Sequence, residues 1–154
     1  APAPFVAPIG VPFVLRALAY SAWSTPATMQ WFFASMSVAG ADFDMRRALD
    51  DDDYELADAA RSVAGSVLVA ASAPFTDDEL RAVVAGARAS ALFIGRNETV
   101  TDAPASAARA EQFGMRARTY ADSGHLMFME AHADAIAHDI VHFVRTAQLP
   151  PPHQ

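Results

Sequence analysis

Hydrophobic residues recur at helical spacing over residues 13–38, where apolar side chains fall three or four positions apart. Pro26 divides this stretch into two predicted helices, and Ser24 or Thr25 can cap the second. Both helices are apolar on nearly every side, so we expect them to pack on another surface or to line a pocket. The preceding residues, 1–12, contain four prolines and are predicted to be extended or irregular.

The second half of the chain alternates short apolar runs with helical patterns. Thr76 and Glu79 form a capping box, which predicts a helix over residues 77–87. The elements expected after it are a strand over 90–95, a helix over 103–113 that Asp102 caps and Gly114 ends, a strand over 116–121 and a helix over 131–147. The first strand is apolar throughout, as in a strand buried on both faces of a parallel sheet. This alternation is typical of α/β folds, the class we predict.

Between these two halves the pattern is less specific. Four consecutive aspartates at 50–53 favour the solvated start of a helix over 54–63, because acids suit the positive end of a helix dipole. A cation site is the alternative, although calcium loops use alternating ligands and a glycine. Residues 66–71 fit either a strand or a buried helix.

The last helix is predicted to have an apolar face and a polar face. The apolar face is expected to consist of Ile136, Ile140 and Val144. The polar face carries Glu130, Asp134, His138 and His142, one every four residues. Such a histidine pair can hold zinc, but an exposed face with weak acid–histidine pairs is the favoured interpretation. We therefore expect no metal, and without a glycine-rich phosphate loop or dinucleotide motif we expect no cofactor.

Composition narrows the class of protein. The 154 residues are 53% apolar and 19% charged, which suits one domain, or a piece of a larger one, rather than a disordered chain. The net charge of −7, with arginine as the only basic residue type besides histidine, argues against broad capture of nucleic acid. There is no cysteine, no apolar run of the ~18 residues that span a membrane and no visible signal peptide. We expect a cytoplasmic protein that binds neither nucleic acid nor membrane.

Candidate chemistry lies where the two predicted strands end. Glu98 follows the strand over 90–95, and His125 follows the strand over 116–121. The carboxyl ends of parallel strands meet at one edge of a sheet, which is where α/β proteins place their sites. A carboxylate there can hold an imidazole in one tautomer and stabilise its protonated form. Together the two residues indicate the acid and base of a catalytic triad.

Residues 89–147 resemble the C-terminal end of an α/β-hydrolase. The late pattern of that family is a buried strand followed by Gly-x-x-acid, and then a second strand followed by Gly-His-x4-Glu. Here the pattern reads LFIGRNE at 92–98 and GHLMFME at 124–130. The resemblance implies that Glu98 is the triad acid, with Asp102 as the reserve candidate, and that His125 is the general base. It also implies a mainly structural position for Glu130 at the start of the final helix.

The resemblance further implies a division of the chain. Residues 1–88 would form a linker and helical cap, 89–148 the C-terminal part of the core, and 149–154 a disordered tail. Cap residues of such enzymes shape an apolar pocket, although plain packing of cap on core is an equal alternative. The candidate substrate-binding residues are Tyr20, Trp23, Met29, Trp31, Phe32, Phe33, Met36 and Leu126.

The chain departs from that family in one respect. It has no Gly-x-Ser-x-Gly nucleophile elbow, and the early strands that form most of the sheet are absent. We therefore expect a second polypeptide, or a missing N-terminal half, to supply the nucleophile and complete the sheet. The predicted function is hydrolysis of an ester, or a related acyl or C–C bond, in a small apolar substrate. The alternatives are an epoxide hydrolase or dehalogenase type, a non-hydrolytic binding protein or cyclase, and a fragment with no activity of its own.

Overall fold

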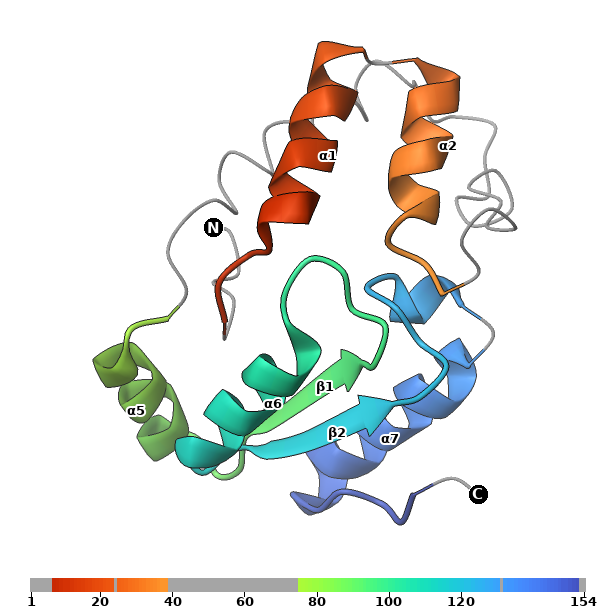
Figure 1. Cartoon of the computed structure of the whole chain (residues 1–154). Coiled ribbons are helices and arrows are strands. Elements are labelled where there is room, and N and C mark those ends of the chain that lie inside the picture. Colours follow the sequence, from red (N-terminus) through yellow and green to blue (C-terminus); the bar gives the residue numbers. More distant parts are fainter. Residues whose placement is uncertain (1–6, 24, 39–74, 131, 153–154) are drawn as a thin grey trace.

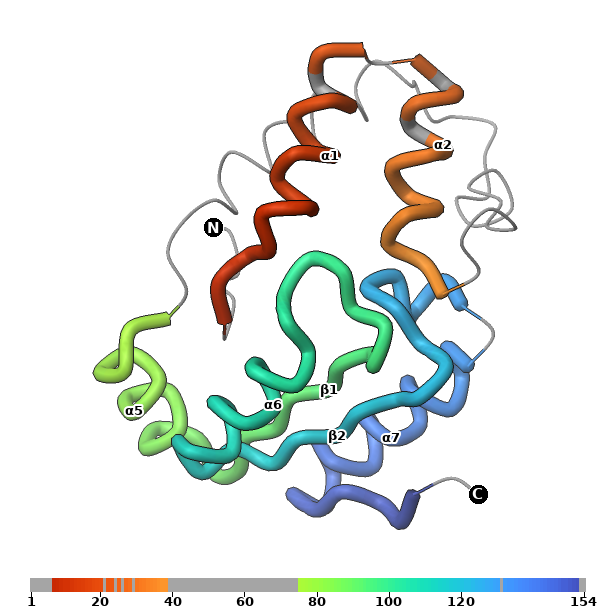
Figure 2. Tube along the Cα trace, in the orientation of Figure 1, coloured from red at the N-terminus to blue at the C-terminus, as the bar shows by residue number. Residues whose placement is uncertain are grey.

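The computed structural model describes residues 7–23, 25–38, 75–130 and 132–152 (Figures 1 and 2). The described elements are the helices α1 (Val11–Ala22), α2 (Pro26–Ala34), α5 (Asp77–Gly86), α6 (Ala103–Gln112) and α7 (Ala133–Thr146), the 3-10 helix η2 (Met127–Met129), and the strands β1 (Ala91–Gly95) and β2 (Arg116–Tyr120). The predictions for residues 50–53, 54–63 and 66–71 lie outside the described residues.

The helices α1 and α2 stand side by side at one end of the chain (Figure 1). Pro26 opens α2, and the hydroxyl of Thr25 caps it by accepting from the amide of Thr28, so the predicted division at this proline is confirmed. The ring of Phe32 lies 5.2 Å from that of Tyr20, centroid to centroid, in a stacked arrangement. It also lies 5.6 Å from the ring of Phe13. Aromatic packing therefore joins the two helices.

A parallel pair of strands, β1 and β2, forms the sheet of the described residues. Their register pairs Phe93 with Arg118 and Gly95 with Tyr120, so these residues share one face. That face meets α7, because Phe93 packs edge-on against Phe143 of that helix. Alternation along the strands leaves the other face to α6, which lies on the opposite side in Figure 1. The structure is thus a mixed α/β arrangement, as predicted at that level.

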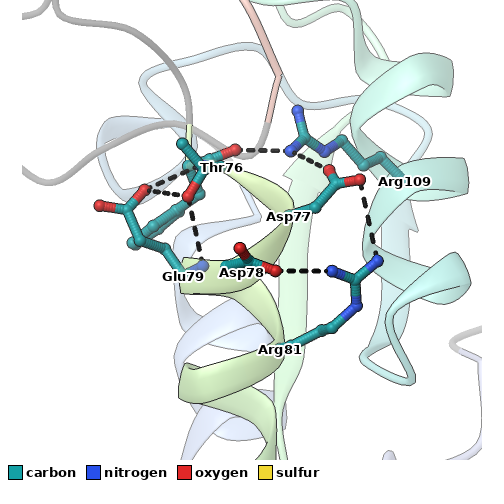
Figure 3. Close-up of polar contacts among 7 residues, drawn as sticks. Thr76, Asp77, Asp78, Glu79, Arg81 and Arg109 are labelled. Carbon is teal, nitrogen blue, oxygen red and sulfur yellow. Dashed lines mark hydrogen bonds and ion pairs between the residues drawn. The ribbon is translucent and has the colours of Figure 1, made fainter.

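Polar contacts dock the start of α5 onto α6 (Figure 3). The hydroxyl of Thr76 accepts from the amide of Glu79, whose carboxylate accepts from the amide and hydroxyl of Thr76, which confirms the predicted capping box. These hydrogen bonds, the backbone one first, lower the pKa of Glu79. Arg109 of α6 reaches across to Asp77 at 3.1 Å. The acidic start of α5 therefore has a structural explanation.

The predicted apolar face of α7 is partly wrong. Ile136 is fully buried and Ile140 partly so, but the side chain of Val144 is 75% exposed. The face that meets the sheet instead centres on Ile136, Asp139 and Phe143. At 100° per residue, Val144 falls roughly 105° from the centre of that face, which explains its exposure.

Asp139 is buried because two side chains of β2 partner it. Its carboxylate accepts a 2.8 Å hydrogen bond from the hydroxyl of Tyr120, and Arg118 lies 3.4 Å away. Arg118 also donates to the carbonyl oxygens of Pro150 and Pro151. Part of the segment expected as a disordered tail is therefore held against the edge of the sheet.

This buried cluster predicts a loss of stability in alkali. Burial, and then the hydrogen bond to Asp139, raise the pKa of Tyr120. An unfolded tyrosine ionises near pH 10, so above that pH unfolding releases a proton and the free energy of unfolding falls, by up to about 1.4 kcal/mol per pH unit. We expect Tyr120→Phe to lose about 1–3 kcal/mol at pH 7 but to decline less steeply above pH 10. Urea unfolding at pH 7, pH 9 and pH 11 measures both effects, and parallel declines in the two proteins would refute this prediction.

Among the helices of the described residues, none combines the length and the apolar character needed to cross a lipid bilayer.

Candidate active site

The loops that leave β1 and β2 are hydrogen-bonded to each other. The amide of Arg96 donates to the carbonyl of Tyr120 at 2.8 Å, and the amide of Asn97 donates to the carbonyl of Ser123 at 3.0 Å. The side-chain amide of Asn97 donates to the carbonyl of Ala121 at 3.0 Å. The ladder of the sheet is thus continued into the loops, which fixes the separation of the residues that they carry.

Glu98 and His125 are brought together by these loops. The Oε2 atom of Glu98 lies 2.8 Å from Nδ1 of His125. The other carboxylate oxygen, Oε1, accepts from the amide of Val100 at 2.6 Å, so both oxygens of Glu98 are engaged. The Glu98 side chain is 9% exposed, whereas that of His125 is 33% exposed. The acid is therefore enclosed while the imidazole reaches the surface.

This geometry defines what the imidazole can do. A carboxylate beside Nδ1 accepts a hydrogen bond from Nδ1–H and so leaves the lone pair of neutral histidine on Nε2. No described residue forms a hydrogen bond with Nε2. An imidazole held in this way can accept a proton at Nε2.

The reserve candidate, Asp102, has a different position. Its carboxylate accepts a 2.8 Å hydrogen bond from the amide of Ala105 and caps α6. The carboxylate beside His125 is that of Glu98, four residues earlier. Asp102 therefore fills the capping position that its place before a helix predicts.

Two glycines permit the close approach of the loops. A Cβ atom at Gly95 would lie 2.3 Å from the carbonyl oxygen of Ser123 and 2.5 Å from that of Gly124. A Cβ atom at Gly124 would lie 2.5 Å from the carbonyl oxygen of Met36. These contacts are with backbone atoms, which cannot swing aside as a flexible side chain can. The site therefore requires glycine at the end of β1 and immediately before His125.

The candidate substrate-binding residues fall into different environments. Tyr20, Phe32 and Met36 are buried in one apolar cluster with Phe13 and Val100, and Phe33 and Leu126 pack against it. Trp23 and Trp31 are 70% and 49% exposed. The side chain of Met29 lies outside the described part of the chain. The cluster lies close to the histidine, because the carbonyl of Met36 accepts from the amide of His125 at 2.8 Å.

Sequence reasoning missed the contacts that join the end of α2 to both loops. Besides the bond from His125 to Met36, the hydroxyl of Thr99 donates to the carbonyl of Ser35 at 3.1 Å.

The resemblance places Glu130 at the start of the last helix, as a mainly structural residue. It lies three residues before α7 and accepts from the amides of Gly124 and Val38. Backbone contacts of this kind leave no pattern in side-chain type.

A hollow of about 360 Å³ lies along β2, on the side of Arg118, Tyr120 and His132. Neither Glu98 nor His125 contributes to its lining.

Within the described ranges, no three acidic or histidine side chains are grouped to hold a metal ion, and His138 is largely exposed.

Comparison of the chain with protein-family models, with curated proteins and with solved structures finds no match.

Proposed function

We propose that this chain supplies the general base and the acid of a hydrolase of the α/β-hydrolase type. The observation that carries the proposal is the 2.8 Å contact between Glu98 and His125, formed at the ends of adjacent parallel strands. The helices and strands could form without an enclosed acid beside a partly exposed imidazole, so the fold itself does not explain this pair. Such a pair has a direct use in proton transfer.

In this proposal His125 removes the proton of a nucleophile through Nε2 and later activates the water that releases the acyl group. Glu98 holds the imidazole in the required tautomer and stabilises it when it is protonated. The nucleophile and the oxyanion donors lie on another polypeptide or in a further N-terminal half, because the printed sequence has no nucleophile elbow. The substrate is an ester, or a related acyl or C–C compound, with an apolar acyl or ring group.

The assignment of the acid is tested by a matched pair of variants in the assembled enzyme, with a p-nitrophenyl ester as the probe. Glu98→Gln should lower kcat by about 10²–10⁴-fold, because a neutral amide neither fixes the tautomer nor stabilises the imidazolium. Asp102→Asn keeps a capping side chain and should leave kcat within about twofold. Equal activity of the Glu98 variant and the unmodified enzyme would remove Glu98 from the mechanism.

A further inference from the structure

The turn that carries His125 is held from two sides by one side chain. The Oε2 atom of Glu130 accepts from the amide of Gly124 at 2.8 Å. Its Oε1 atom accepts from the amide of Val38 at 2.8 Å. The carboxylate therefore bridges the residue before the histidine and the segment that follows α2, which lies 92 residues away from it in sequence.

The same segment also contacts the histidine itself. The amide of His125 donates to the carbonyl of Met36, two residues before the amide that Glu130 holds. The histidine turn and the segment after α2 are packed tightly here. A Cβ atom at Gly124 would lie 2.5 Å from the carbonyl oxygen of Met36 and 3.0 Å from the amide nitrogen of Val38. The backbone of the histidine turn is thus fastened directly and through Glu130 to residues 36–38.

We infer that Glu130 is a positioning residue, whose two carboxylate oxygens fasten the 36–38 segment to the Gly124–His125 turn and so fix the imidazole against Glu98. A charged acceptor shared between two backbone donors gives strong hydrogen bonds. A movement of α2 that displaces residues 36–38 then moves the histidine as well. This inference deepens the proposed function, and it rests on that function only for its effect on turnover.

Hydrogen exchange of the full chain tests the inference without a substrate. In Glu130→Gln one carboxylate oxygen becomes an amide NH₂, which cannot accept from a backbone amide. We expect exchange at the amides of Gly124, Val38 and His125 to rise about 10–100-fold, while the amides of β1 change little. Glu111→Gln, at an exposed position of α6, is the matched control and should change none of them.

Two results would overturn the inference. One is exchange at the three amides that is unchanged in Glu130→Gln. The other is an equal rise in the exchange rates of these three amides and of the β1 amides, which would mean that the variant only loses global stability. In the assembled enzyme, Glu130→Gln should lower kcat and leave KM within about twofold, because it misplaces the base rather than the substrate.

The two proposals fail in different ways. Released amides in Glu130→Gln together with full turnover in His125→Ala would uphold the positioning contact and refute the hydrolase. Unchanged amides together with lost turnover in His125→Ala would refute the role of Glu130 alone.

Discussion

Replacement of His125 by alanine is expected to abolish turnover of the assembled enzyme, with kcat reduced at least about 10⁴-fold. The variant removes the only group that the proposal gives for taking the proton of the nucleophile. The imidazole is one-third exposed and, within the described part of the chain, its hydrogen-bond partner is Glu98. Its removal leaves Oε2 of the enclosed Glu98 without this partner while Oε1 keeps the bond from Val100, so urea unfolding of the variant is measured alongside its activity. Hydrolysis of a p-nitrophenyl ester, followed at saturating substrate, measures the effect.

A second histidine provides the control. His142 lies in the second half of α7, on a different element from the candidate site, and within the described residues its imidazole forms no hydrogen bond. His142→Ala should keep full turnover. If His125→Ala also keeps full turnover while its unfolding curve matches that of the unmodified protein, the general base is elsewhere and the proposed function is wrong.

Replacement of Gly95 by alanine is expected to cost about 3 kcal/mol or more of the free energy of unfolding. The added methyl group would lie 2.3 Å from one backbone oxygen and 2.5 Å from another, well inside van der Waals contact. Relief of this clash must push the loop after β2 away from β1, which also breaks the bond between the amide of Asn97 and the carbonyl of Ser123. Urea unfolding measures the cost.

The matched control is Gly86, the last residue of α5. Within the described residues, no atom other than those of its two chain neighbours and of the backbone of its own helix lies within 4 Å of a Cβ atom built there. Gly86→Ala is therefore expected to be neutral or to stabilise by up to about 1 kcal/mol, since alanine has the higher helix propensity. Equal stability of the Gly95 and Gly86 variants would contradict the tight approach of the two loops.

The parts of the structure that depend on residues close together in the sequence could be predicted from the sequence. The caps at Thr76 and Asp102 were predicted because each side chain bonds an amide three residues away. The meeting of Glu98 and His125 was also predictable, because parallel strands end at one edge of a sheet. In each case the sequence itself carries the spacing that the contact requires.

The remaining contacts depend on tertiary packing that no local pattern encodes. A buried Asp139 contradicts helical amphipathicity, and its partners Tyr120 and Arg118 lie on another element, β2. In this orientation of α7, Val144 faces solvent. The bond from Val38 to Glu130 likewise joins distant segments through a backbone amide, which every residue except proline possesses.

The residue type at the nucleophile position separates the alternatives that share this acid–base pair. A serine at that position supports ester or acyl hydrolysis, and an aspartate supports the epoxide hydrolase or dehalogenase type. Alanine or glycine there supports a binding protein or a cyclase. The pair of Glu98 and His125 is compatible with the first two chemistries, since each needs a base to activate water.

The most direct test of the central claim is the intact mass of the purified protein under native and denaturing conditions. The account predicts a native mass above 16.4 kDa, which on denaturation either separates into this chain and a second polypeptide or stays one longer chain, with a nucleophile elbow in the added sequence. A mass of 16.4 kDa under both conditions would contradict it, because this chain alone cannot complete the triad.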